Sequence, residues 1–401
     1  MVCDMSKDCF YLINGTIITP YRVLPSRGLL IEGSKIKDLF PMDSFHPHSG
    51  AKILDVKGAC IAPGFIDMHL HGGGGADVMD GTPEAFAAIA EAHAKGGTTS
   101  IVPTTLTSSM RDLKRAIAAF EEAGKMKISG SRLLGLHLEG PYFAPSQRGA
   151  QDIRFIKDPV REEYLSILDS SSSILRVSAA PELPGGLELG RELRRRGILA
   201  SIGHTDASYD EVLMAVEAGY SHVTHLYSGM SGVHRVRAYR IAGAIESGLL
   251  LDELTVEIIA DGKHLPASLL KLIYKCKGAD KIALCTDSIR AAGMPEGEFL
   301  LGNPEDGQMT VVDEGVAWLP DRSAFAGSIA TTNLLVRNMV NLAGVSLQDA
   351  VKMATLTPAT ILKTDDAKGS IDRGKDADIV VFDEDINVRM TIVEGKVVYR
   401  A

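Results

Sequence analysis

Apolar and polar residues alternate in short runs at both ends of the chain, and this pattern is typical of β-strands. The runs are separated by the turn-forming dipeptides Asn14-Gly15 and Glu394-Gly395 and by Glu32-Gly33-Ser34. The strands expected at the two ends are Cys9–Ile13, Thr16–Ile18, Gly28–Ile31, Lys35–Leu39, Ala51–Val56, Ile379–Phe382, Val388–Val393 and Lys396–Tyr399. We therefore expect residues 1–60 and 360–401 to form one small, discontinuous β-sandwich domain.

The middle of the chain, residues 61–359, alternates between expected strands and helices. The expected strands are Ala62–His71, Thr99–Thr105, Leu133–Glu139, Ile174–Ala180, Ile198–Gly203, His222–Leu226, Thr255–Ala260 and Ile282–Thr286. Helical periodicity appears in Pro83–Lys95, Met110–Gly124, Tyr209–Gly219, Pro266–Lys277, Thr331–Ala343 and Ser346–Thr355. Eight strands alternating with helices predict an α/β fold, a (β/α)₈ TIM barrel. Hairpin-like signals in residues 295–327 indicate an insertion after the eighth strand.

Composition narrows the class of protein. The 401 residues are 45% hydrophobic and 23% charged, with a formal net charge of −9. This composition is typical of a globular protein and argues against nucleic-acid binding as the main role. The five cysteines lack Cys-x-x-Cys spacing, which favours a reducing compartment and argues against a thiolate zinc site. The N-terminal residues show no signal-peptide pattern, and no apolar run is long enough to cross a membrane, so we expect a cytoplasmic protein.

Two histidines lie near the end of the first expected barrel strand. Alternate residues of a strand face the same side, so His69 and His71 share one face, about 7 Å apart at the backbone. Their imidazoles can therefore converge on one metal ion. The glycine run that follows, Gly72–Gly75, lets the chain turn sharply beside a bound group.

Side chains that can bind metal fall at the ends of five further expected strands. They are His137, Glu139, His204, His222, His225, Asp261, His264 and Asp287. Any one of them could be a hydrogen-bonded structural residue, but the carboxyl ends of barrel strands meet at one rim. We therefore expect a centre that holds one or two divalent metal ions. Imidazole and carboxylate ligands suit Zn²⁺, our first expectation, but also Fe²⁺, Co²⁺, Ni²⁺ and Mn²⁺.

Asp287, the last of these residues along the chain, is the candidate general acid/base. A carboxylate beside a metal-activated water can accept its proton and later pass it on. The alternative role of Asp287 is that of a metal ligand only.

Six short motifs, in this order, resemble those of the amidohydrolase superfamily. They read Pro-Gly-Phe-Ile-Asp-Met-His-Leu-His-Gly, His-Leu-Glu-Gly-Pro, Gly-His-Thr, Thr-His-Leu-Tyr, Ala-Asp-Gly-x-His and Thr-Asp-Ser. Within the superfamily, His-Leu-Glu-Gly-Pro and Thr-His-Leu-Tyr resemble the deacetylases of phosphorylated N-acetyl amino sugars. Many members carry a carbamylated lysine on the fourth strand, but Ile174–Ala180 contains no lysine, and Glu139 on the third strand takes its place, as in the deacetylases.

The resemblance implies roles for particular residues. Glu139, His204 and His225 match the principal metal ligands, His69 and His71 match ligands of a second ion, and Asp287 matches the acid/base. Residues expected to contact the substrate are Gln151, Ser228, Gly229, His264 and Ser328. The resemblance also implies a homodimer in which a loop of each subunit reaches the phosphate in its partner's site.

That loop departs from the family pattern. Members commonly carry Asn-Ala-Met after Thr-His-Leu-Tyr/Phe, where this chain has Ser228, Gly229 and Met230. They also carry an Arg-Glu-Pro-Gly segment, which is absent between Ser231 and Arg240. Arg237 and then Arg235 are the candidates for binding phosphate, and a solvated basic loop is the alternative.

The resemblance implies that the chain removes the acetyl group from N-acetyl-D-glucosamine 6-phosphate. Two alternatives stay open. The first is another amidohydrolase, acting on N-acetylgalactosamine 6-phosphate or a different amide. The second is a non-catalytic relative, although such a protein is expected to have lost ligands and this chain has the full set.

Overall fold

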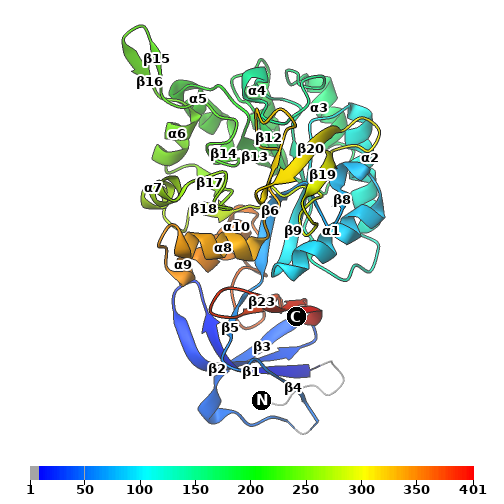
Figure 1. The fold of residues 1–401 in the computed structure, drawn as a ribbon, viewed down its shortest axis with the longest axis vertical. Helices are drawn as coiled ribbons and strands as arrows, with labels where there is room; N and C mark the ends of the chain where they lie inside the picture. Colours follow the sequence, from blue (N-terminus) through cyan, green and yellow to red (C-terminus); the bar gives the residue numbers. More distant parts are fainter. Residues whose placement is uncertain (1–8, 49) are drawn as a thin grey trace.

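A computed structural model describes residues 9–48 and 50–401, and the middle of this part of the chain forms a parallel barrel (Figure 1). Eight strands of the barrel follow one another in chain order, each beside the next. They are β6 (Phe65–Leu70), β9 (Thr98–Thr105), β11 (Leu136–Glu139), β12 (Ile174–Ala179), β13 (Leu199–Ile202), β14 (Tyr220–Val223), β17 (Thr255–Ile258) and β18 (Ile282–Leu284). The first and last strands meet where Asp287 N donates to His69 O at 2.9 Å, so the predicted (β/α)₈ architecture is confirmed.

Helices surround the barrel. They are α1 (Pro83–Lys95), α2 (Met110–Ala123), α3 (Arg161–Leu168), α4 (Gly186–Arg196), α5 (Tyr209–Ala218), α6 (Ala244–Leu250), α7 (Ala267–Lys277), α8 (Thr332–Asn341), α9 (Leu347–Met353) and α10 (Leu356–Ile361). The helices predicted from periodicity agree with these bounds to within two residues. None of the helices in the described ranges is long and apolar enough to cross a membrane.

Strands from both ends of the chain form a separate sheet below the barrel in Figure 1. They are β1 (Cys9–Ile18), β2 (Val23–Glu32), β3 (Lys35–Pro41), β4 (Lys52–Asp55), β5 (Cys60–Pro63), β22 (Ile379–Phe382), β23 (Val388–Val393) and β24 (Lys396–Arg400). Hydrogen bonds join these strands into one sheet, in which β5 pairs with β1 on one side and β22 on the other. The sheet has its own apolar core, to which Leu12, Ile61 and Ile379 belong.

Three strand predictions need correction. Asn14-Gly15 is not a hairpin turn, because β1 continues through it with an irregular register against β2 and with Asn14 at φ 59°. Gly15 lies so close to Ile61 that a Cβ would be 2.3 Å from its Cδ1, so packing against β5 explains this glycine. The expected strand Ala62–His71 is two strands, β5 and β6, separated at Gly64. The expected strand Leu133–Glu139 is likewise divided, because residues 134–135 separate β11 from the short strand before it.

Several short strands supplement the eight barrel strands and the terminal sheet. The insertion after the eighth barrel strand forms β19 (Gly297–Leu301), β20 (Gln308–Asp313) and β21 (Val316–Trp318), an antiparallel sheet that confirms the hairpin signals. The other short strands are β7 (Gly72–Gly73), β8 (Ala76–Asp77), β10 (Arg132–Leu133), β15 (His234–Val236) and β16 (Tyr239–Ile241). The β15–β16 hairpin projects from the body of the molecule (Figure 1).

Candidate metal and substrate site

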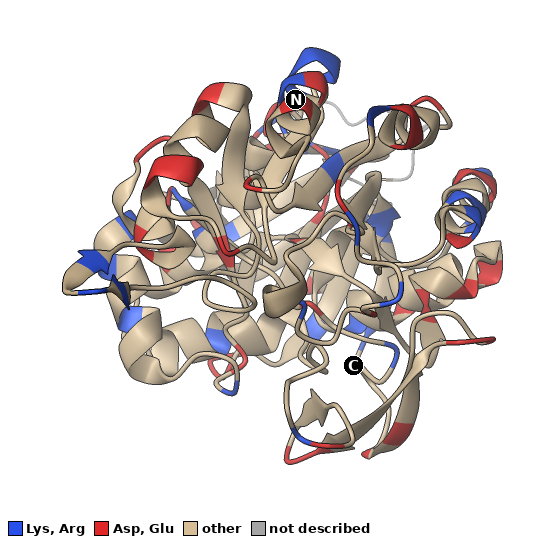
Figure 2. Cartoon of the chain, turned by 90° about the horizontal axis from the view of Figure 1, so that it is seen from above, with Lys and Arg blue, Asp and Glu red and all other residues tan. Residues whose placement is uncertain are grey.

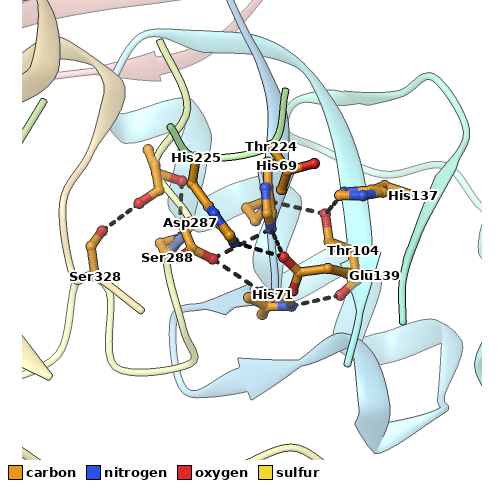
Figure 3. A network of polar contacts seen from close by, with 12 residues as sticks. His69, His71, Thr104, His137, Glu139, Thr224, His225, Asp287, Ser288 and Ser328 are labelled. Carbon is orange, nitrogen blue, oxygen red and sulfur yellow. Dashed lines mark hydrogen bonds and ion pairs between the residues drawn. The ribbon is translucent and has the colours of Figure 1, made fainter. Parts of the chain in front are cut away.

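Five of the predicted ligands converge around the carboxylate of Glu139, and Figure 3 shows four of them with it. Glu139 Oε1 lies 3.0 Å from His225 Nε2 and 3.4 Å from both His204 Nε2 and His69 Nε2. Glu139 Oε2 lies 3.2 Å from His71 Nε2. Asp287 Oδ1 is 3.0 Å from His71 Nε2 and 3.4 Å from His69 Nε2.

The ends of the barrel strands place these side chains. His69 lies in β6 and Glu139 is the last residue of β11, whereas His204, His225 and Asp287 lie just beyond their strands. These last three adopt positive φ angles of 47°, 26° and 48°. Left-handed backbone is unfavourable for residues other than glycine and is concentrated at functional sites. The turn after each strand therefore directs the side chain back over the barrel mouth.

The donor atoms fit a divalent cation. His69 Nε2 and His204 Nε2 are buried and have no hydrogen-bond partner, although both face the carboxylate of Glu139. Among the described residues, three groups of ligand atoms each lie within 4.8 Å of one another. Two of them share Glu139: one contains Glu139, His204 and His225, and the other contains His69, His71 and Glu139. The third group contains His69, Glu257 and Cys285. Imidazole nitrogens around a carboxylate are the ligands that Zn²⁺ and similar ions take.

Backbone carbonyls fix the orientation of two of the histidines. His71 Nδ1 lies 3.1 Å from Thr104 O, and His204 Nδ1 lies 2.8 Å from Gln147 O. A carbonyl oxygen only accepts, so each Nδ1 carries a hydrogen and Nε2 is the ring nitrogen left for a metal ion. In both histidines this nitrogen faces the carboxylate of Glu139.

Opposite charges in the cluster shift its pKa values in the metal-free protein. Burial lowers the pKa of the His69 imidazole, but the carboxylates of Glu139, Glu257 and Asp287 outweigh burial and raise it to about 9. Burial raises the pKa of Glu139, but His69, His204 and His225 hold it well below its usual value. Burial likewise raises the pKa of Asp287, whereas His69 and His71 lower it. Asp287 is thus an ionised carboxylate at neutral pH.

A cavity of about 310 Å³ opens over these groups. Its floor contains His71, Glu139, His204, His225 and Asp287. The walls are formed by Leu106, Gly149, Ala150, Gln151, Tyr227, Ser228, Gly229, His264, Ile289, Leu301, Ala324, Phe325, Ala326 and Gly327. The cavity therefore offers a ligand both apolar walls and polar groups beside the cluster.

Four of the predicted substrate-contacting residues line this cavity: Gln151, Ser228, Gly229 and His264. Gln151 Nε2 donates to Glu139 Oε2 at 2.7 Å, and its Oε1 accepts from Thr107 N at 2.8 Å. His264 Nδ1 lies 2.7 Å from Asp261 Oδ2, which leaves the opposite ring nitrogen for a ligand. Gly229, at φ 58°, leaves no room for a side chain, because a Cβ would lie 2.7 Å from Gln147 O.

The other three predicted substrate residues do not line the cavity. Ser328 is fully buried, and its hydroxyl donates to Thr286 O at 2.6 Å (Figure 3). The neighbouring residues 324–327 form the wall, so the loop reaches the cavity but the Ser328 side chain points into the protein. Arg235 and Arg237 lie in the exposed β15–β16 hairpin, outside the cavity of their own chain.

The sequence interpretation missed a charged pair inside the barrel, Arg176 on β12 and Glu257 on β17. Both residues are fully buried and lie beneath the metal cluster. The sequence did contain a signal: β12 and β17 each carry one charged residue among apolar or small residues. A charge buried in such a strand requires a partner of opposite charge. Strand pattern alone did not show that these two residues face each other.

Comparisons with known proteins agree with this architecture. The profile described as the amidohydrolase family matches residues 60–398. The chain is 36% identical over 356 residues to an N-acetylglucosamine-6-phosphate deacetylase of Lysinibacillus sphaericus, covering 88% of this chain and 89% of that protein. It is 34% identical over 337 residues to an N-acetylgalactosamine-6-phosphate deacetylase of Escherichia coli O157:H7, covering 84% and 87%. The crystal structure of N-acetylglucosamine-6-phosphate deacetylase from Pasteurella multocida superposes with a TM-score of 0.91 at 29% identity, covering 98% of this chain and 100% of that one.

Proposed function

Because the chain belongs to the amidohydrolase family, we propose that it hydrolyses the acetamido group of N-acetyl-D-glucosamine 6-phosphate to acetate and D-glucosamine 6-phosphate. The observation that carries this proposal is the convergence of Glu139, His71, His204, His225 and Asp287 on the floor of one cavity. The fourth histidine, His69, lies against this floor, with its Nε2 3.4 Å from both Glu139 Oε1 and Asp287 Oδ1. The names of relatives at 31–36% identity support the choice of substrate.

In this proposal, Glu139, His204 and His225 hold one divalent ion, zinc being our first candidate, and His69 and His71 hold a second beside Glu139 and Asp287. A bound ion of this kind polarises the amide carbonyl and activates water. Asp287 is ionised at the pH of the cell and borders the cavity, so it can accept a proton from water. It then passes the proton to the amide nitrogen, which leaves as the amine.

The cavity walls supply the groups that would orient the sugar. Ser228 and His264 present polar groups to the cavity, and Gly229 allows the chain to approach the ligand closely. Gln151 stands beside Glu139 and can also donate to the acetyl carbonyl when that oxygen is near. Leu106, Ile289 and Leu301 form an apolar wall against which a methyl group can pack.

We also propose that the protein is a cytoplasmic homodimer in which each β15–β16 hairpin reaches the partner's cavity. Among the described residues that line the cavity there is no lysine or arginine, although a phosphate needs cationic donors. The hairpin carries Arg235, Arg237 and Arg240, and Figure 2 shows its basic strands protruding from the molecule. Val236 and Tyr239 are 52% and 75% exposed on the same hairpin, which gives a partner subunit apolar surface to contact.

A second candidate substrate is N-acetylgalactosamine 6-phosphate, because the Escherichia coli relative named for that sugar is 34% identical, close to the identity of the others. The two sugars differ only in the orientation of one ring hydroxyl. The acetate-release experiment therefore includes both epimers.

Acetate release from a panel of substrates tests the proposal. The panel contains both 6-phosphorylated N-acetyl sugars, unphosphorylated N-acetylglucosamine and an N-acetyl amino acid, with metal content measured on the same samples. We expect one to two equivalents of divalent metal and at least a tenfold preference in kcat/KM for a phosphorylated sugar. Glu139→Ala should lose most of the metal and the activity. A preference for the amino acid, or unchanged metal in Glu139→Ala, would contradict the proposal.

A further inference from the structure

A buried ion pair lies beneath the proposed metal centre. Arg176 Nη1 lies 2.5 Å from Glu257 Oε2, and Arg176 Nη2 lies 2.9 Å from Glu257 Oε1. Both side chains are fully buried. Their strands, β12 and β17, are separated by β13 and β14, so the pair crosses the interior of the barrel. A two-pronged contact of this kind fixes the plane of the carboxylate.

One oxygen of Glu257 contacts residues of both ligand groups. Glu257 Oε1 lies 2.6 Å from His69 Nδ1 and accepts a hydrogen bond from the backbone N of His225 at 3.1 Å. Because the carboxylate is ionised and only accepts, the hydrogen of the His69 ring resides on Nδ1. Nε2 is therefore the ring nitrogen of His69 that a metal ion would take in place of a proton, and it faces Glu139 and Asp287, where the atom has no hydrogen-bond partner.

Arg176 is itself held on several sides, so Glu257 cannot turn away from His69 without losing a fixed partner. Arg176 Nε donates to Ser201 Oγ at 2.9 Å, and Nη2 donates to Thr224 Oγ1 at 2.9 Å. Nη1 also donates to the carbonyl of Met68, the residue before His69, at 3.2 Å. The guanidinium thus ties the carboxylate to β6, β13 and the residue before His225.

Glu257 acts on one ligand side chain in particular. His71 and His204 are oriented by the carbonyls of Thr104 and Gln147, as described above. His225 Nδ1 has no partner among the described residues, and only the backbone of His225 contacts Glu257. Among the histidine ligands, His69 alone depends on a side-chain carboxylate for its orientation.

We propose that Glu257, held by Arg176, is a positioning residue that fixes His69 and thereby determines whether the second metal position is filled. The inference rests on the proposed metal centre and concerns the position formed by His69, His71 and Glu139. The position formed by Glu139, His204 and His225 keeps its side-chain orientation without Glu257. Replacement of an outer partner of a metal-binding histidine typically lowers metal affinity about 10- to 100-fold.

Zinc titration of metal-stripped protein, followed by elemental analysis after dialysis, tests this proposal. Glu257→Gln keeps the shape of the side chain but directs an amide toward either Arg176 or His69. We expect the parent to bind two equivalents and Glu257→Gln to bind the second at least tenfold more weakly, as His69→Ala should. The affinity for the first equivalent should change less than threefold. The titration needs no substrate, so failure of the proposed deacetylase activity would leave its result intact.

Two further variants separate positioning from folding. The double variant Arg176→Met/Glu257→Leu replaces the pair by apolar side chains of similar length, which proteins often tolerate. It should fold, as judged by circular dichroism, and still lose the second equivalent. Asp378→Asn makes the same carboxylate-to-amide change in a buried ion pair with Lys368, away from the cavity, and should keep both equivalents. Three results would overturn the proposal: a parent that binds only one equivalent, two equivalents retained without Glu257, or both equivalents lost together.

Discussion

His204, His225 and Asp287 each combine a left-handed backbone with a side chain in the cavity floor. Such a conformation costs on the order of 1–3 kcal/mol for each residue and persists only where neighbouring contacts hold it. The backbone of Asp287 is held on both sides, since its N donates to His69 O at 2.9 Å and its O accepts from Ser328 N at 2.8 Å. A substitution that keeps the length of the Asp287 side chain therefore tests its chemistry without moving the chain.

At this scale we predict that Asp287→Asn retains metal and KM but lowers kcat at least 100-fold, because an amide cannot accept the proton. Steady-state acetate release and elemental analysis check this prediction. Asp169→Asn, a surface change far from the cavity, should behave as the parent. Loss of one metal equivalent would assign Asp287 the role of a ligand, and a kcat within threefold of the parent would exclude it as the acid/base.

His222 gives a prediction about pH. Burial lowers the pKa of its imidazole to about 4. Between pH 6.5 and 4 the unfolded chain takes up a proton at this histidine that the folded protein does not, so stability falls as the pH drops through this range. The loss attributable to His222 should be on the order of 3 kcal/mol.

Urea unfolding of metal-free protein at pH 7.5 and 4.5 measures this effect. His222→Asn should reduce the difference in unfolding free energy between the two pH values. His234→Asn, in the exposed hairpin, should leave that difference unchanged. Equal pH dependence in His222→Asn and the parent would show that His222 does not cause the loss.

Among the elements, the segment before β22 is fastened to the β2–β3 turn by a small ion cluster. Lys368 Nζ lies 2.6 Å from Asp378 Oδ2 and 3.0 Å from Asp376 Oδ2. Lys35, which is half exposed, binds the other oxygen of Asp376 at 2.7 Å. The two lysines differ in burial, because Lys368 is only 8% exposed whereas Lys35 is half exposed.

We predict that Lys368→Met lowers the free energy of unfolding by about 3–5 kcal/mol, since it leaves the buried carboxylate of Asp378 without its charged partner. Lys35→Met removes an exposed partner from the same cluster and should cost less than about 1 kcal/mol. Urea unfolding of both variants makes the comparison. Similar losses of unfolding free energy in the two variants would show that burial does not make the Lys368 ion pair more important than the Lys35 ion pair.

How much the sequence could predict differs from element to element. The residues of the cavity floor could be brought together from sequence because parallel strands end at one rim, which requires only the strand assignment. The split of Ala62–His71 at Gly64 could not be predicted from the sequence. Gly64 packs so closely against Thr99 that a Cβ would lie 2.2 Å from its side chain, and this contact exists only in the folded protein. The direction of the Ser328 hydroxyl and the pairing of Arg176 with Glu257 also depend on neighbours distant in sequence. What the cavity residues do stays a prediction.

For the molecule as a whole, charge distribution is the main argument for a dimer. The chain carries a net charge of −9, while the arginines of the β15–β16 hairpin stand away from their own cavity. We predict that Arg237→Ala raises KM for the 6-phosphorylated sugar about tenfold, equivalent to about 1.4 kcal/mol. It should leave the slow reaction of the unphosphorylated sugar nearly unchanged. Equal weakening of both substrates would mean that the hairpin supports folding rather than phosphate binding.

Mixed dimers test whether the hairpin acts on the partner's site. When Asp287→Asn and Arg237→Ala chains are combined, one site of each hybrid dimer carries both changes and the other carries neither. Mixing should therefore restore sites with the parental kcat and KM. Hybrid dimers that show no such recovery would place the hairpin beside its own cavity or outside the reaction.

The pairing of strands from both ends of the chain affects how the protein folds during translation. Its strand β5 pairs with β22, with Ala62 opposite Val380, so one edge of β5 has no neighbour until residues 64–378 have been translated. Exposed strand edges invite pairing with other chains, and contacts between distant residues form slowly. The nascent chain must carry this open edge, directly ahead of the first barrel strand, through almost its entire synthesis. A chaperone that shields residues 60–63 during translation would protect the barrel as well as the sheet.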